Sequence, residues 1–195
     1  MPRLSCLTLA LCLVAAPFAV AAQERPLTDD EVRDLARREV VWCENWSDDT
    51  RDCESLYMLR GGADGALIQS GMFVMSEQPA IRVLVAEVVT LIDGRLCSWG
   101  STDELNIQAT MDGQPSLEAS LMVRALFTEA MAEYADAQIC QQLFATDDPA
   151  ALEEIITADE ERLPDFESSY RLGTVETRFL LRPVMDEESE PQVQL

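Results

Sequence analysis

The sequence contains no histidine and no lysine, so its 14 basic residues are all arginines. Without histidine, Ser-His-Asp and Cys-His catalytic arrangements are excluded, and without lysine so are Schiff-base chemistry and the phosphate-loop lysine. There is also no Gly-x-Gly-x-x-Gly motif for a dinucleotide and no Cys-x-x-Cys motif for thiol exchange. We therefore expect no cofactor, and the sequence favours a protein that is not an enzyme.

Positive charge is also scarce, since 36 acidic residues give the chain a net charge of −22. Such a charge repels nucleic acid and anionic membranes, so we expect neither as a partner. A well-solvated acidic surface explains the charge most simply. An acidic docking face for a cationic protein is the alternative.

The N-terminus has the pattern of a signal peptide. Arg3 precedes an apolar run from Leu4 to Val20, which ends in the small residues that a signal peptidase reads, so residues 1–22 are the predicted leader. Pro17 interrupts the run and no basic cluster follows it, which argues against membrane insertion after cleavage. In composition the chain resembles small, acidic, disulfide-linked proteins that bacteria export, a resemblance that implies periplasmic or secreted localisation and no activity.

Cleavage of this leader would leave four cysteines, an even number that predicts two disulfides in an exported chain. Four cysteines allow three connectivities. We favour a bond between Cys43 and Cys53, because these residues enclose a short polar loop, and the bond between Cys97 and Cys140 follows by elimination. Zinc binding is the rival interpretation, but the sequence has neither the spacing nor the histidine for such a site.

The stretch from Ala80 to Trp99 is the most strongly patterned part of the chain. Its first part is β-branched and apolar on both faces, which is typical of a central strand. Asp93-Gly94 then suits a two-residue type I′ turn, and Arg95 to Trp99 is the expected return strand.

The remaining elements follow from periodicity and turn residues. Thr28 and Glu31 have the spacing of a capping box, which predicts a helix ending near Glu39. Further strands are expected at 40–43, 55–60, 66–75, 105–111 and 174–182. The segment 149–158 suits a helix or a strand, and the acidic residues 184–195 are expected to be disordered.

Apolar residues from Leu117 to Ile139 recur at helical spacing with no glycine or proline, which predicts one long helix. Its acidic residues fall in a narrow arc, so we expect it to be largely buried against the sheet. The predicted fold of residues 23–183 is thus a single α+β domain. An antiparallel β-meander packs on this helix, and two disulfides staple the domain, with Cys97–Cys140 fastening the end of the helix.

Glu87 is the best candidate for a catalytic acid, because it interrupts an apolar strand face where burial would raise its pKa. A structural ion pair with Arg124 of the long helix is the simpler explanation. An exposed or edge position is the third.

Two further groups are weak candidates for binding sites. The acidic loop residues Asp48, Asp49, Asp52 and Glu54 could offer oxygen ligands to calcium, although Arg51 lies among them and the spacing is not that of an EF-hand. Three tryptophans near the cysteines suit ordinary core packing. If the meander curls toward a barrel, these tryptophans could instead line a small apolar cavity together with Tyr57 and Phe73. The three tryptophans are Trp42, Trp46 and Trp99.

The sequence thus favours an exported, non-enzymatic domain that binds a protein partner or a small ligand, or serves as an envelope component. A hydrolase that uses two carboxylates is one alternative, and it requires two acids to converge in one cleft. An acidic docking or inhibitor protein for a cationic partner is the other.

Overall fold

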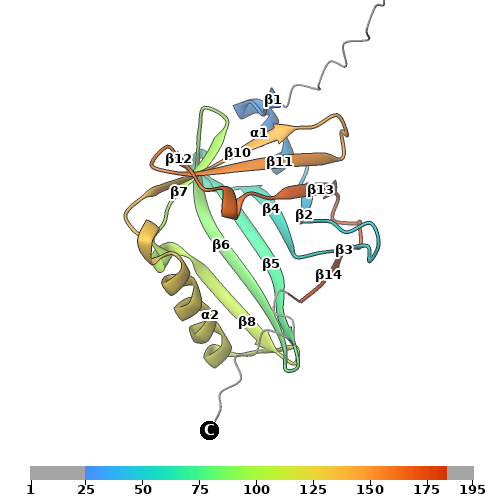
Figure 1. Ribbon diagram of the computed structural model, residues 1–195, viewed down its shortest axis with the longest axis vertical. Helices are drawn as coiled ribbons and strands as arrows, with labels where there is room; N and C mark the ends of the chain where they lie inside the picture. The colour runs from blue at the N-terminus through green and yellow to red at the C-terminus, as the bar shows by residue number, and fades with distance from the viewer. Residues whose placement is uncertain (1–24, 184–195) are drawn as a thin grey trace, which may run out of the picture.

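We describe the fold from a computed structural model, which places residues 25–183 (Figure 1). The predicted signal peptide, residues 1–22, and the predicted acidic tail, residues 184–195, lie outside the described residues. Of the helices in the described part, none is long and apolar enough to cross a membrane.

Eight antiparallel strands close into a barrel in which neighbours in the sheet are also neighbours along the chain. The closing contact joins the last strand to the first, with Tyr170 opposite Glu44 and Leu172 opposite Trp42. The strands of the barrel are β2 (Val41–Glu44), β4 (Ser55–Gly61), β5 (Leu67–Glu77), β6 (Ala80–Ile92), β7 (Arg95–Trp99), β10 (Gln138–Ala145), β11 (Ala151–Ala158) and β13 (Ser169–Gly173).

The closed barrel shows that the predicted α+β meander on a long buried helix was wrong. Helix α2 (Leu117–Ala130) ends nine residues before Ile139 and buries only Ala119 and Val123, whereas Leu117 is 76% exposed and Leu121 is 58% exposed. The sheet covers one face of this helix, and its other apolar residues face outward. Apolar side chains all round a helix therefore did not establish its burial.

Both predicted disulfides, Cys43–Cys53 and Cys97–Cys140, are present. For Cys97–Cys140, however, the secondary structure that the bond connects differs from the prediction. Cys140 lies on β10 directly opposite Cys97 of β7, so the bond joins two paired strands and not a strand to the end of a helix.

The N-terminal helix α1 (Asp29–Arg37) seals one end of the barrel. The predicted capping box is present, because the Thr28 hydroxyl accepts from the amide of Glu31 and the Glu31 carboxylate accepts from the amide of Thr28 at 2.9 Å. The helix places Val32 and Leu35 in the main core cluster, beside inward-facing residues of the strands. Local capping and packing thus fix the helix over the barrel end.

The hairpin of β6 and β7 also follows the prediction. Asp93 and Gly94 have φ angles of 50° and 79°, as a type I′ turn requires. A Cβ atom at Gly94 would overlap the carbonyl oxygen of Leu27, so the turn also needs glycine in order to approach the start of α1.

Strands β5 and β6 extend beyond the barrel, where β6 pairs with β8 (Asn106–Met111) instead of β7. Helix α2 covers this extension through a second core cluster, which includes Val83, Ile107 and Val123. The extension carries α2 to the side of the barrel opposite α1, as Figure 1 shows. The end of α2 is thereby brought next to the barrel interior.

The segment 149–158 forms strand β11 and not a helix. Of the predicted strand Thr174–Arg182 only Leu180–Leu181 is a strand, because Thr174 and Thr177 form a local turn through two hydrogen bonds of 2.9 Å. The minor elements are β1 (Arg25–Pro26), β3 (Asp52–Cys53), β9 (Gln114–Pro115), β12 (Glu161–Arg162), β14 (Leu180–Leu181) and the short 3₁₀ turns at 63–65, 102–104, 132–134 and 164–166.

Candidate ligand-binding cavity

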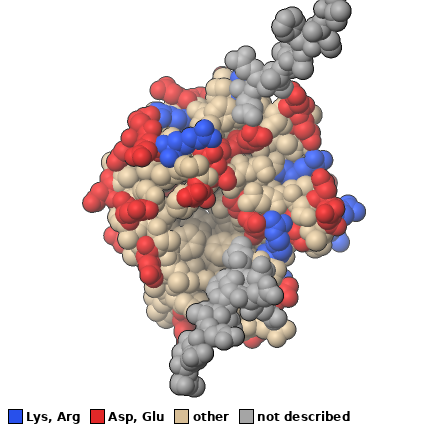
Figure 2. All heavy atoms as spheres, in the orientation of Figure 1, with Lys and Arg blue, Asp and Glu red and all other residues tan. Residues whose placement is uncertain are grey.

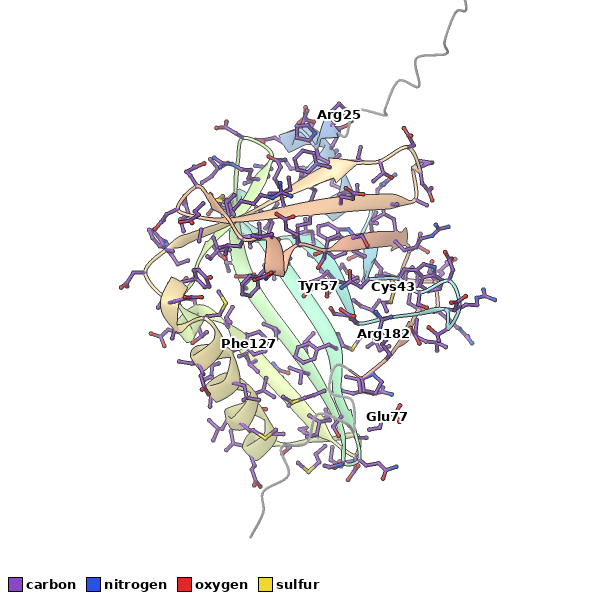
Figure 3. All side chains as sticks on the ribbon, in the orientation of Figure 1. Arg25, Cys43, Tyr57, Glu77, Phe127 and Arg182 are labelled. Atoms are coloured by element: carbon purple, nitrogen blue, oxygen red, sulfur yellow. A yellow bond between two sulfur atoms is a disulfide. The ribbon has the colours of Figure 1, made fainter. Side chains whose placement is uncertain are left out.

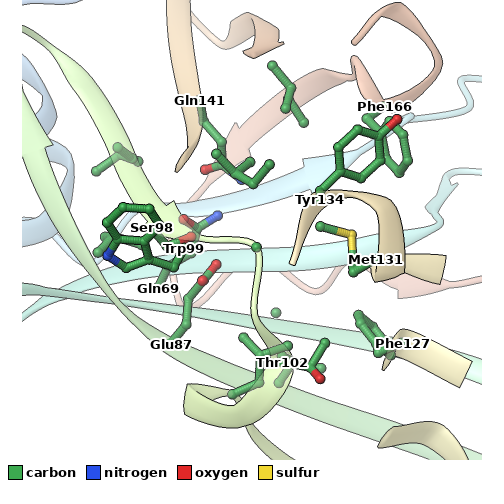
Figure 4. A pocket seen from close by; sticks show the side chains of 18 of the residues that line it. Gln69, Glu87, Ser98, Trp99, Thr102, Phe127, Met131, Tyr134, Gln141 and Phe166 are labelled. Atoms are coloured by element: carbon green, nitrogen blue, oxygen red, sulfur yellow. The ribbon is translucent and has the colours of Figure 1, made fainter. Parts of the chain in front are cut away.

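A cavity of about 260 Å³ lies inside the barrel at the end away from α1. Its walls come from six barrel strands, and its rim comes from the segments after β7, the end of α2 and the 3₁₀ turns that follow α2 and β12 (Figure 4). The lining residues are Tyr57, Gln69, Gly71, Phe73, Val85, Glu87, Val89, Leu96, Ser98, Trp99, Gly100, Ser101, Thr102, Leu105, Phe127, Met131, Tyr134, Ile139, Gln141, Ile156, Leu163 and Phe166.

The cavity has a solid floor. Val89 and Leu96 line it from below and belong at the same time to the packed core under α1, where each is 2% exposed. Gly71 of β5 adds no side chain to the wall, and a Cβ atom there would lie 2.7 Å from the ring of Tyr57. The hollow therefore begins where the large aliphatic residues of the floor end.

Aromatic residues surround the opening. Phe127 stacks near Phe73 with ring centroids 6.2 Å apart, and Tyr134 meets Phe166 edge to face at 5.9 Å. Figure 3 shows Phe127 on the side of α2 that faces the sheet. Trp99 lies at the rim and is 60% exposed. Around the hollow the surface is mostly uncharged, and acidic side chains lie along its upper and left borders (Figure 2).

Glu87 is the single carboxylate among the described residues that line the cavity, and no arginine lines it. Burial raises the pKa of its carboxyl, and a hydrogen bond with the Ser98 side chain opposes that shift. The predicted ion pair with Arg124 was wrong, because the Arg124 guanidinium donates to the carbonyl oxygens of Thr102 at 2.9 Å and Leu105 at 2.8 Å. Glu87 thus faces the cavity without a cationic partner from the described chain.

Two glutamine side chains accompany Glu87. Gln69 lies directly opposite it on β5 and is 4% exposed, and Gln141 reaches the same space from β10. The carbonyl oxygens of both amides are buried and accept no hydrogen bond from the described residues. An unpaired buried acceptor typically costs about 1–3 kcal/mol of stability. Two buried acceptors without a donor therefore lie beside Glu87 in the barrel wall.

A second polar group lies deeper in the barrel. The Tyr170 hydroxyl donates to Glu154 at 2.8 Å, and Glu44 accepts from Ser168 at 2.6 Å and from Ser55. Burial raises the pKa of Glu154 to about 8, against the opposing effect of the Tyr170 hydrogen bond, and the Glu44 carboxylate raises it further. Glu154 is thus mainly a neutral carboxylic acid at pH 7.

The three tryptophans occupy different places. Trp99 lines the cavity, as do Tyr57 and Phe73. Trp42 lies in the packed core and is 1% exposed, and its ring centroid is 5.8 Å from that of Tyr170. Trp46 is outside the cavity lining, where its ring meets Phe179 edge to face at 5.8 Å and its Nε1 donates to Asp48 at 2.8 Å. Of the three candidates, the structure brings only Trp99 to the cavity.

The acidic loop is held by an arginine. Arg182 donates to Asp52 and to Glu54, each at 2.9 Å, and the hydrogen bond from Arg182 lowers the pKa of Asp52. Figure 3 shows Arg182 near Cys43, at the edge of the barrel away from α2. Among residues 25–183 no group of three or more histidine, cysteine or acidic side chains is placed to hold a metal ion. The four acids of the loop therefore do not converge on one metal site: Asp48, Asp49, Asp52 and Glu54.

Sequence reasoning did not identify Gln69, Ser98 or Gln141 as parts of a site. Each stands at an inward position of a strand, and Glu87 was noticed only because it interrupts a longer apolar run. For the rim residues Phe127, Met131 and Tyr134, the helical spacing in the sequence predicts a buried stripe of a long helix and no part in a site. Several successive strands each carry one polar residue at an inward position. This pattern is the sequence signal that could have identified the polar residues of the cavity wall.

Comparison of the chain with family models, with curated proteins and with solved structures gives no match.

Proposed function

We propose that the chain is an exported, non-enzymatic protein that binds one small, largely apolar ligand inside its barrel. The observation that carries this proposal is the cavity itself, which has a packed floor, apolar and aromatic walls and a few convergent polar groups. This combination is typical of small-molecule sites, and eight-stranded barrels are wide enough to hold one small ligand. Its volume of about 260 Å³ favours a ligand of about one ring.

Export to the periplasm or to the medium is part of the proposal. The two disulfides support it, because such bonds persist mainly in oxidising compartments. The predicted leader agrees with the same compartment.

The two alternatives have less support. A two-carboxylate hydrolase needs a second acid in the cleft, and among the described lining residues Glu87 is the one carboxylate. An acidic docking protein would use the outer charge, and salt-sensitive complexes with cationic proteins would favour it over ligand binding.

The experiment that tests the proposal compares two variants of one strand. Val85→Phe places a ring in the cavity wall, whereas Val88→Phe adds the same ring three residues later at a site that is 62% exposed. Titration calorimetry with 2-phenylethylamine, 2-phenylethanol and phenylacetate should show binding of at least one compound to the wild type. We expect about tenfold weaker binding by Val85→Phe and little change in Val88→Phe.

Absence of binding by all three compounds would overturn the proposal. Equal binding by Val85→Phe and Val88→Phe would overturn it as well, because the compound would then bind outside the barrel. Circular dichroism of both variants checks that they are folded.

A further inference from the structure

We propose that the ligand is a small organic cation, an ammonium group on an apolar and preferably aromatic body, whose nitrogen lies between Glu87, Gln69 and Gln141. This inference rests on the proposed function, since it names the class of ligand for the same cavity. It follows from three independent features of the wall, which are its charge, its free acceptors and its rings.

The charge of the wall has one sign. Glu87 is the one carboxylate on the described lining, and the arginine that sequence reasoning assigned to it donates elsewhere. A carboxylate inside a protein is normally paired with a cation or with several donors. The Ser98 side chain is the hydrogen-bonding group that acts on Glu87, so a cationic ligand would complete the pairing.

The unpaired acceptors beside Glu87 suit an ammonium group, which carries only donors. Gln69 is buried to more than nine-tenths, and its carbonyl oxygen and that of Gln141 have no donor among the described residues. Figure 4 shows Gln69, Glu87 and Gln141 pointing from three different strands toward one region of the cavity. A primary ammonium has three donors and no acceptor, so it can serve all three side chains at once. An anionic ligand would instead be repelled by the Glu87 carboxylate.

The aromatic residues fit the rest of such a ligand. Phe127, Tyr134, Phe166 and Trp99 stand around the opening, where their faces can contact an apolar body and attract a cation by the cation–π interaction. The cavity volume of about 260 Å³ suits the body of a single-ring amine. The net charge of −22 attracts cations to the whole molecule.

The test uses three compounds of nearly equal shape on the full mature chain at pH 7. These are 2-phenylethylamine, which is a cation, 2-phenylethanol, which is neutral, and phenylacetate, which is an anion. Titration calorimetry should give about tenfold tighter binding of the amine than of the alcohol, and the weakest binding for phenylacetate.

Glu87→Gln keeps the shape of the side chain and removes its charge. We expect about a tenfold loss of amine affinity in this variant and less than about a twofold change for the alcohol. Glu77→Gln is the matched control, because Glu77 is an exposed residue at the far end of β5, and its amine affinity should equal that of the wild type.

A pH series distinguishes a charge effect from loss of structure. The cation binds the ionised form of Glu87, so amine affinity of the wild type should rise from pH 5 to pH 8 and stay flat in Glu87→Gln. The groups that face Glu87 are Tyr57 of β4, Gln69, Ser98 and Gln141, and the acids Glu44 and Glu154 act on Tyr57 from deeper in the barrel.

The outcomes separate the two proposals. If the alcohol or phenylacetate binds as tightly as the amine, and Val85→Phe still weakens that binding about tenfold, the cavity binds ligands but the inference about the cation is wrong. Amine binding that is unchanged in Glu87→Gln also overturns it. If no compound binds at all, the proposed function itself fails.

Discussion

The two halves of the barrel interior are built from the same strands and differ in what fills them. Under α1 the inward positions carry large residues such as Trp42, Leu59 and Leu143, which are at most 1% exposed. On the side of α2 the inward positions carry Gln69, Gly71 and other residues that leave a cavity. The difference arises because α1 inserts its apolar stripe into the barrel end, whereas α2 packs on the extension of β5, β6 and β8 and contributes only its end to the rim.

Stability and binding are therefore expected to depend on different halves of the barrel. The packed half has no room for a ligand, and the hollow half gains fewer contacts for its own folding. Variants of the two halves should therefore separate the two properties.

The largest expected effect concerns the bond between β7 and β10, the strands that carry Ser98 and Gln141 into the hollow half. Cys97 and Cys140 are separated by 43 residues, and Cys43 and Cys53 by 10. The chain-entropy relation gives a loss of about 4 kcal/mol for Cys97→Ser/Cys140→Ser and about 2.7 kcal/mol for Cys43→Ser/Cys53→Ser. Urea unfolding of both double variants measures the difference, and a larger loss from the shorter loop would contradict it.

In the packed half, Leu143→Ala should lower the free energy of unfolding by about 3 kcal/mol, because Leu143 is 0% exposed and its removal leaves a void. In the hollow half, Val85→Ala should cost less than about 1 kcal/mol, since the Val85 side chain already borders the cavity. Chemical denaturation of the two variants provides the test. Equal losses would mean that the hollow half is as tightly packed as the other.

The acid between the two halves should make stability depend on pH. Glu154 has a pKa of about 8 in the fold and about 4.5 when exposed, so the folded state retains a proton that the unfolded state releases. Stability is therefore complete below about pH 4.5 and falls by up to about 1.4 kcal/mol per unit as the pH rises toward 8. The raised pKa of Glu87 has an effect of the same sign.

Glu154→Gln removes this titrating group and should be less sensitive to pH between 5 and 8. Urea midpoints at both pH values measure the effect. If the stability of Glu154→Gln depends on pH as steeply as that of the wild type, Glu154 is ionised in the folded protein. The exposed Glu31 provides a contrast, because hydrogen bonding with Arg25 lowers its pKa to about 2 and its contribution is lost only in acid.

The smallest expected effect is at the cap of α1. Thr28→Ala removes the side chain that accepts from the amide of Glu31, which typically costs about 1 kcal/mol. Thr28→Ser keeps the cap and should be close to the wild type. Because α1 seals the packed half, neither variant should change the affinity of the cavity for its ligand by more than about twofold. A larger change would show that the packed half and the hollow half are energetically coupled.

Local features of the fold were predictable from the sequence. The capping box at Thr28 and the turn at Asp93-Gly94 each depend on a few neighbouring residues, whereas the sequence left the position of Glu87 open between the core and an exposed edge. The pairing of cysteines was also predictable, because Cys43 and Cys53 enclose a short polar loop and the pairing of Cys97 with Cys140 then follows by elimination.

Long-range features were not predictable in the same way. Closure of the barrel depends on β13 pairing with β2, which are separated by most of the chain. The residues from Gln138 to Ala145 continue an apolar pattern that suits either a helix or a strand, and pairing with β7 and β11 decides for the strand. The cavity follows from that closure, so its wall could not be assembled from spacing alone.

Methyl NMR of the protein with and without 2-phenylethylamine tests the central claim most directly. If the ligand binds in the hollow half, the largest shifts should occur at Val85, Met131 and Ile139, and Leu143 of the packed half should change little. Shifts confined to Leu121 and Met122, which are exposed on α2, would place the compound outside the barrel and contradict the account.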